Sequence, residues 1–180
     1  MKKIIIISSL LFSGLYFSQV AIGKSSISNP TVSLEFGTEN KGLLLPWVTN
    51  EASVIGAVNG TMIYDSAVKK VKVKLAAGWK DLSVTTTGTT IDPITNIDGL
   101  LLQGASIAEQ AAAKVSIGNP TSTPGILVLE DTNKAMVLPK VSRPHLNIIN
   151  PAPGMMVYDT QNQLLCVFNG KDWAFWKTQQ

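Results

Sequence analysis

The chain has 180 residues, and its 15 lysines and arginines against 12 aspartates and glutamates give a formal net charge of +3. Arg143, Cys166 and His145 are the only residues of their kinds. This composition excludes an intrachain disulfide and disfavours nucleic-acid binding, which needs clustered arginine and lysine. It also lacks the paired histidine or cysteine spacings of metal sites.

Residues 1–18 are predicted to be a secretory signal peptide. Lys2 and Lys3 precede an apolar stretch from Ile4 to Leu15, and the small Ser18 suits cleavage before Gln19. The alternative is a membrane anchor, but the stretch is shorter than the roughly 20 residues that span a bilayer. Cleavage leaves 13 basic against 12 acidic residues, a net charge of +1. We therefore expect an exported protein, extracellular, surface-bound or periplasmic, without a transmembrane span after cleavage.

Residues 19–83 are predicted to form a first unit of short strands. The apolar run Leu43 to Leu45 ends at Pro46, which has no N–H for a strand ladder. A helical turn is expected within Glu51 to Val58, and a meander follows through Met62 to Tyr64, Lys70 to Leu75 and the strand beginning at Trp79. Lysines alternate with apolar residues in the middle strand, which predicts a solvated face over a buried one.

Residues 84–114 are predicted to form a connector, because their composition differs from that of the units on either side. The threonine-rich segment 85–90 is expected to be extended and exposed. The capping-box spacing of Ser106 and Glu109 predicts a short helix through Lys114.

Residues 115–180 are predicted to be a second copy of the first unit, about 94 residues later. Proline returns at Pro139, Ser142-Arg143-Pro144 suggests a capped helical turn, and Gly154 leads into a strand ending at Tyr158. Asn169-Gly170 is typical of a tight hairpin turn, and Trp173 follows it.

The predicted fold is mainly β with short helices. Two repeated units of short strands each end in a three-stranded meander, and an extended or helical connector joins them. Large aromatic side chains supply most of the buried area of small cores. We expect four of them to anchor the two cores: Tyr64, Trp79, Tyr158 and Trp173.

The chemistry-bearing residues favour structural over catalytic roles, so no catalytic, cofactor or metal site is predicted. Asp65 and Asp159 follow the repeated tyrosines and precede Ser or Thr, where carboxylates accept hydrogen bonds from turn N–H groups. Paired carboxylates, or weak calcium binding at Asp159, are the alternatives. His145 is expected at the surface. Cys166 is expected to be a buried thiol, with an intermolecular disulfide as the alternative.

Three aromatic residues outside the repeated core positions are candidate interaction residues: Trp47, Phe175 and Trp176. They suit a stacking platform for sugars or an interface for another chain. The alternative is that they pack the two units against each other.

The repeated motifs resemble a module of exported surface proteins from Bacteroidota-type bacteria and of phage tail-fibre-like proteins. They are Val-x-Ile-Gly, Lys-Gly-x-Leu-Leu-Pro, Gly-Met-x-Val-Tyr-Asp-Thr and Asn-Gly-x-x-Trp, through residues 20–79 and 115–173. Most members are uncharacterised, and many carry the module upstream of stalks or trimeric fibre domains. The first unit departs from the pattern, since Trp47 stands where the family usually has arginine.

The resemblance implies a non-enzymatic structural or interaction protein that acts in adhesion or in fibre or envelope assembly. The expected partner is a second copy, with a trimer favoured by analogy, or another surface protein. The alternative function is a carbohydrate-binding module that uses the exposed tryptophans.

Overall fold

The computed structural model describes residues 19–84, 87–103, 113–118 and 122–177. The predicted signal peptide and most of the predicted connector helix lie outside these residues. Within them the regular secondary structure consists of short β-strands, one short helix and two 3-10 turns. The predicted fold class is therefore confirmed.

The first repeat begins with three short strands, β1 (Val20–Ile22), β2 (Val32–Phe36) and β3 (Leu43–Leu44), followed by β4 (Trp47–Val48) and the 3-10 turn η1 (Glu51–Ser53). It ends in β5 (Met62–Asp65), β6 (Lys70–Leu75) and β7 (Gly78–Asp81). A second 3-10 turn, η2 (Gly99–Gln103), follows in the connector.

The second repeat has the same strands in the same order, with an α-helix in place of the 3-10 turn η1. They are β8 (Val115–Gly118), β9 (Leu127–Glu130), β10 (Ala135–Val137), β11 (Lys140–Val141), the helix α2 (Pro144–Asn147), β12 (Met155–Asp159), β13 (Leu164–Phe168) and β14 (Trp173–Trp176). Pro139 separates β10 from β11 as Pro46 separates β3 from β4, because proline cannot donate to a strand ladder.

Each repeat builds one four-strand array in the same register. In the first, β4 pairs parallel with β5, and β5, β6 and β7 pair antiparallel, with Tyr64 opposite Val71. In the second, β11, β12, β13 and β14 repeat this pattern with Tyr158 opposite Leu165. The Asn169-Gly170 turn that the sequence predicts does join β13 to β14, and Gly170 has the positive φ of +98° that such a turn requires.

The repeats also exchange strands. β10 of the second repeat pairs parallel with β2 of the first, so that β1, β2 and β10 make one sheet. β3 of the first repeat pairs antiparallel with β12 of the second, with Leu43 opposite Met156. Each repeat therefore completes a sheet of the other.

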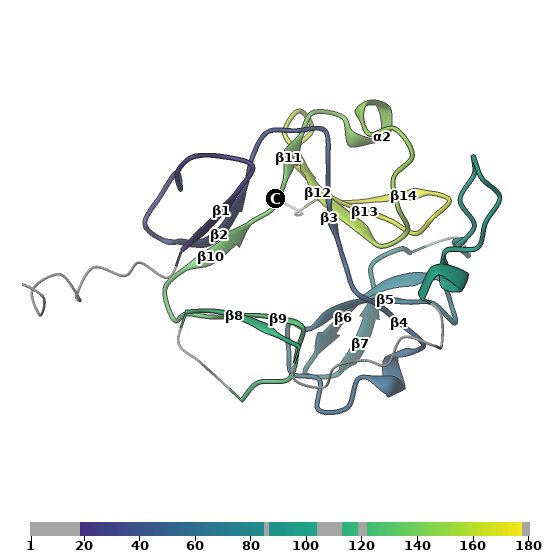
Figure 1. Ribbon diagram of the computed structural model, residues 1–180, viewed down its shortest axis with the longest axis horizontal. Helices are drawn as coiled ribbons and strands as arrows, with labels where there is room; N and C mark the ends of the chain where they lie inside the picture. Colours follow the sequence, from purple (N-terminus) through teal and green to yellow (C-terminus); the bar gives the residue numbers. More distant parts are fainter. Residues whose placement is uncertain (1–18, 85–86, 104–112, 119–121, 178–180) are drawn as a thin grey trace, which may run out of the picture.

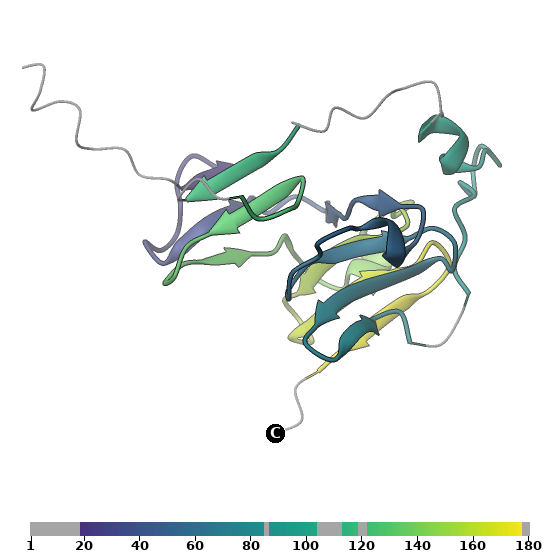
Figure 2. The same ribbon diagram turned by 90° about the horizontal axis from the view of Figure 1, so that it is seen from below.

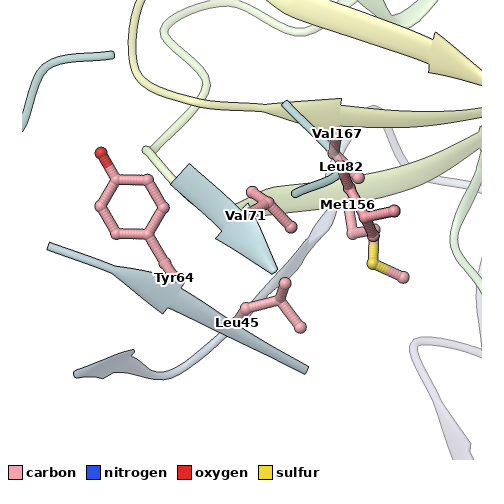
Figure 3. Packing of buried hydrophobic residues seen from close by; sticks show 6 residues of the cluster. All are labelled: Leu45, Tyr64, Val71, Leu82, Met156 and Val167. Atoms are coloured by element: carbon pink, nitrogen blue, oxygen red, sulfur yellow. The ribbon is translucent and has the colours of Figure 1, made fainter. Parts of the chain in front are cut away.

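The molecule has two lobes (Figures 1 and 2). In one lobe the β8–β9 pair lies over the sheet of β1, β2 and β10. In the other, the two four-strand arrays pack face to face around a shared core, whose buried members are Leu45, Tyr64, Val71, Leu82, Met156 and Val167 (Figure 3). This core holds the repeats together.

The opposite face of the second array has a smaller core of Val141, Ile148, Val157 and Cys166. The position of Cys166 is taken in the first array by Lys72, which bonds Glu51 and Asp65 at 2.7 and 2.8 Å. The same backbone thus carries an apolar core in one repeat and an ion cluster in the other.

Three sequence expectations need correction. The lysine face of β6 is not freely solvated, because Lys70 and Lys72 have side chains only 18% and 14% exposed and are bound to carboxylates. In the threonine-rich segment, Gly88 and Thr90 are buried. A Cβ on Gly88 would come within 1.8 Å of the Asn169 carbonyl oxygen, so this segment packs tightly against the second repeat. The third correction concerns the turn before α2, where Arg143 occupies the N-cap without a side-chain hydrogen bond, although Pro144 does begin the helix.

Candidate interaction site

The best-defined candidate site is the contact between the two repeats. Tyr64 is fully buried and its hydroxyl donates a hydrogen bond to the carbonyl oxygen of Asn169 at 3.0 Å. The indole N–H of Trp47 donates to the carbonyl oxygen of Pro153 at 2.6 Å, and its ring lies 5.2 Å from that of Tyr64. Burial raises the pKa of Tyr64 well above its usual range, so the phenol stays protonated and keeps its donor.

Gly154 makes this contact possible. Its φ of +87° is in the left-handed region, and a Cβ there would lie 2.9 Å from the Cβ of Tyr64. Trp47 lies on the same side, with its Nε1 3.4 Å from that position. The two aromatic rings of the first repeat therefore close over a glycine of the second.

Trp176 completes the contact at the end of β14. Its indole N–H donates to the carbonyl oxygen of Leu82 at 2.8 Å, and the ammonium of Lys80 lies 4.9 Å from the ring centre. Two of the three candidate interaction residues, Trp47 and Trp176, thus pack the repeats against each other, the alternative that the sequence left open.

Phe175 is 45% exposed and contacts the ring of His145 edge-on at 5.6 Å. It is the most accessible of the three candidate aromatic residues, and His145 is exposed as expected. Carbohydrate binding by these residues stays a prediction.

The second repeat presents an open pocket at positions that include the counterparts of the buried Leu45 and Tyr64. The pocket is about 430 Å³ in volume and is lined by Met136, Val137, Leu138, Lys140 and Tyr158. These residues correspond in the repeat to Leu43, Leu44, Leu45, Trp47 and Tyr64. Tyr158, expected in a core, is instead half-buried at an open surface.

The other repeated aromatic residues differ in their surroundings. Trp173 is half-buried, packs against the Cys166 core and lies 5.2 Å from the ring of Phe168. Trp79 is half-buried in β7. Pro46 and Pro139 have the same backbone role, because their carbonyl oxygens accept the N–H groups of Tyr64 and Tyr158 at 2.9 Å each.

Asp65 and Asp159 tie down the turns after β5 and β12, as predicted. The Oδ1 of Asp159 accepts from the backbone N–H groups of Arg143 and Gln161 at 3.0 and 2.9 Å. Its Oδ2 accepts from the Nδ2 of Asn162 at 2.8 Å. The Oδ1 of Asp65 accepts from the N–H groups of Ala67 and Val68 at 3.1 and 3.3 Å.

The pKa values follow from these bonds. Burial alone would raise the pKa of Asp65, but hydrogen bonds from Lys72 and from backbone N–H groups outweigh it and hold that pKa below its usual range. Burial also raises the pKa of Asp159, but hydrogen bonds from the Asn162 side chain and from backbone N–H groups outweigh it and lower that pKa. Both carboxylates are thus charged at neutral pH, with their oxygens occupied by donors.

Cys166 is fully buried, and burial raises the pKa of its thiol to about 11. A protonated, buried thiol is a poor nucleophile. Among residues 19–84, 87–103, 113–118 and 122–177, no three potential metal ligands cluster together. No helix in that part of the chain is long and apolar enough to cross a membrane.

Residues 116–179 match the family model described as the phage tail like trimerisation region. The match runs from β8 to beyond β14, so it covers the second repeat. No curated protein and no solved structure matches the chain. The match confirms the resemblance to phage tail-fibre-like proteins for this region, while the Bacteroidota-type module stays a prediction. The match to the trimerisation region fits a structural, fibre-like protein that associates with copies of itself.

Proposed function

We propose that this protein is an exported, non-enzymatic structural component that assembles as a homotrimer in a fibre-like or envelope structure. The observation that carries the proposal is the match of the second repeat to a trimerisation region, together with the open apolar pocket at Tyr158 in that repeat. Apolar surface of this kind is stabilised when another surface removes it from water.

The distribution of polar groups supports a structural role. The two repeated aspartates are occupied by turn N–H groups and the thiol is buried and protonated. Nucleophilic catalysis needs a nucleophile within hydrogen-bond reach of a base. The ring of the exposed His145 contacts that of Phe175 edge-on.

The test is the mass of the purified protein in solution. Size exclusion with light scattering in reducing buffer should give three times the mass of one chain, and sedimentation velocity should give the same species across a concentration series. A monomer at every concentration would overturn the proposed assembly. A second experiment tests the proposed export: cross-linking on intact producing cells, followed by fractionation, should recover the trimer outside the inner membrane. Recovery only from the cytoplasmic fraction would contradict export.

A further inference from the structure

The two repeats touch through equivalent faces at the shared core and, beside that core, through two different surfaces. The first repeat contributes a front surface, which we define as Leu43, Leu44, Leu45, Trp47 and Tyr64. The second contributes a back surface, defined as Pro153, Gly154 and Asn169. Because a front surface meets a back surface, the contact is head to tail. In the described part of the chain, the front surface of the second repeat is covered only in part, since Leu138 packs against the shared core while Tyr158 lines an open pocket, and the back surface of the first repeat is exposed.

The partly covered front surface is the pocket at Tyr158. In the first repeat Tyr64 is 0% and Leu45 7% exposed, because the second repeat covers them. Their counterparts Tyr158 and Leu138 are half-buried and line the open pocket. Leu138 also packs against the shared core, so the pocket is a formed surface that the described residues cover only in part.

The exposed back surface lies at the ends of β5 and β6. The counterparts of Pro153, Gly154 and Asn169 are Asn59, Gly60 and Leu75. All three are exposed, Leu75 at 42%. Gly60 has a φ of +90° like Gly154, yet a Cβ there would meet nothing within 4 Å. Gly60 therefore has the backbone conformation of the glycine that Tyr64 covers in the second repeat, but no ring among the described residues contacts it.

The strand pairing of the described residues leaves one edge of each repeat without the partner strand that its counterpart has. β12 pairs with β3 at Met155 and Met156, whereas no strand among the described residues pairs with β5 on the corresponding side of Met62. β2 pairs with both β1 and β10, whereas its counterpart β9 pairs only with β8 in the described part of the chain. Unpaired strand edges carry free N–H and C=O groups that favour pairing with another chain.

We propose that the Tyr158 pocket of one copy receives the Asn59–Gly60–Leu75 surface of a second copy. The intrachain contact of Tyr64 and Trp47 with Gly154 is the template for this interface. The inference rests on the proposed homotrimer: in a cyclic trimer each interface joins two different patches, one from each neighbour. The repeat identifies both patches, with Lys140 at the rim where Trp47 lies in the template.

The test uses one charge on each surface. Tyr158→Arg disables the pocket, and Leu75→Arg disables the surface that enters it. Each should weaken self-association by about 100-fold or more, because an unpaired guanidinium is desolvated in an apolar interface. Ile149→Arg and Ile55→Arg are the matched controls, since both isoleucines lie outside the two surfaces and are 85% and 88% exposed. The controls should retain the mass of the wild-type protein.

Mixing the two variants tests the head-to-tail geometry. The Leu75→Arg protein retains an intact pocket, and the Tyr158→Arg protein retains an intact entering surface. An equimolar mixture should therefore form a one-to-one heterodimer, although each variant alone is a monomer. Near-ultraviolet circular dichroism of each variant should match that of the wild type, which excludes unfolding as the cause.

The outcomes separate this inference from the proposed function. A wild-type trimer that neither arginine variant disrupts would overturn the interface but leave trimerisation standing. Variants that both dissociate but do not pair when mixed would mean that the two surfaces do not meet each other, which also overturns the inference. A wild-type monomer would overturn the proposed function and this interface together.

Discussion

Trp176 donates its indole N–H to the carbonyl oxygen of Leu82 at 2.8 Å, and the two residues occupy equivalent positions in the two repeats. Both belong to or pack on the core between the face-to-face arrays. The repeats therefore do not follow each other as independent units but meet at the ends of their meanders, where the indole and the buried leucine close one shared core.

Trp176→Phe should lower the free energy of unfolding by about 1 kcal/mol, since it removes one hydrogen bond and keeps most of the ring. Trp176→Ala should lower it by about 3 kcal/mol, because a large aromatic side chain leaves the core. Phe175→Ala is the control: it should lower the free energy of unfolding by less than about 1 kcal/mol, since Phe175 is 45% exposed. Urea unfolding followed by circular dichroism measures all three. Equal losses for Trp176→Ala and Phe175→Ala would contradict the packing role of the indole.

Gly154→Ala and Gly60→Ala form a matched pair. Both glycines have φ near +90°, so both substitutions strain the backbone by about 1 kcal/mol. Only Gly154→Ala adds a contact of 2.9 Å with the Cβ of Tyr64, so it should cost about 1–3 kcal/mol more. Thermal unfolding of both substitutions in the Tyr158→Arg background, which we expect to be monomeric, gives the comparison. Identical melting temperatures would mean that Tyr64 does not lie over Gly154 in solution.

Lys72→Met should lower the free energy of unfolding by about 3 kcal/mol, because it leaves the buried Asp65 carboxylate without its cation. Lys74→Met, on the same strand, should change it by less than about 0.5 kcal/mol. Asp65→Asn combined with Lys72→Met should recover part of the loss, since the uncompensated charge is then absent. Denaturant unfolding at pH 7 measures the set. A double variant less stable than Lys72→Met alone would contradict the ion-pair explanation.

Acid should destabilise the fold through Glu35. Bonds from Lys24 and then from Ser28 lower the pKa of this carboxyl to about 2. The unfolded value is about 4.3, so the charged form stabilises the fold above that pH, and the contribution is lost as pH falls toward about 2. Glu35→Gln should therefore flatten the dependence of stability on pH between about 5 and 2. Unfolding midpoints measured across this range, against the wild type, give the result. A slope unchanged in the variant would show that the Lys24–Glu35 bond does not form in solution.

Cys166 should resist thiol reagents in the native protein. Its side chain is fully buried and its pKa is raised to about 11, so the thiolate is scarce at pH 8. Reaction with a chromogenic disulfide should be at least about 100-fold slower than in denaturant, because access requires local unfolding. Rapid labelling of the native protein would contradict the burial of this thiol, and a dimer that a reducing agent dissociates would support the intermolecular disulfide that the sequence left open.

Much of the local structure could be predicted because its signals are local. Alternation of lysine with apolar residues, the prolines after Leu45 and Leu138, and Asn169-Gly170 each constrain the backbone within a few residues. The aspartates after the tyrosines could likewise be assigned to turns, since a carboxylate there reaches the N–H groups two and three residues on.

The sequence by itself determined that two similar units of short strands follow each other, since repetition and periodicity are written along the chain. Only the tertiary structure decided how the units combine. β3 and β10 each join the sheet of the other repeat, and Tyr64 is covered while its counterpart Tyr158 is open. The similar motifs around these two tyrosines cannot distinguish them, because the burial of Tyr64 depends on residues more than 100 positions away, such as Asn169, which lies 105 positions from it. Which surface a repeat uses is set by the neighbour it meets in space, and that neighbour is not encoded in the local pattern.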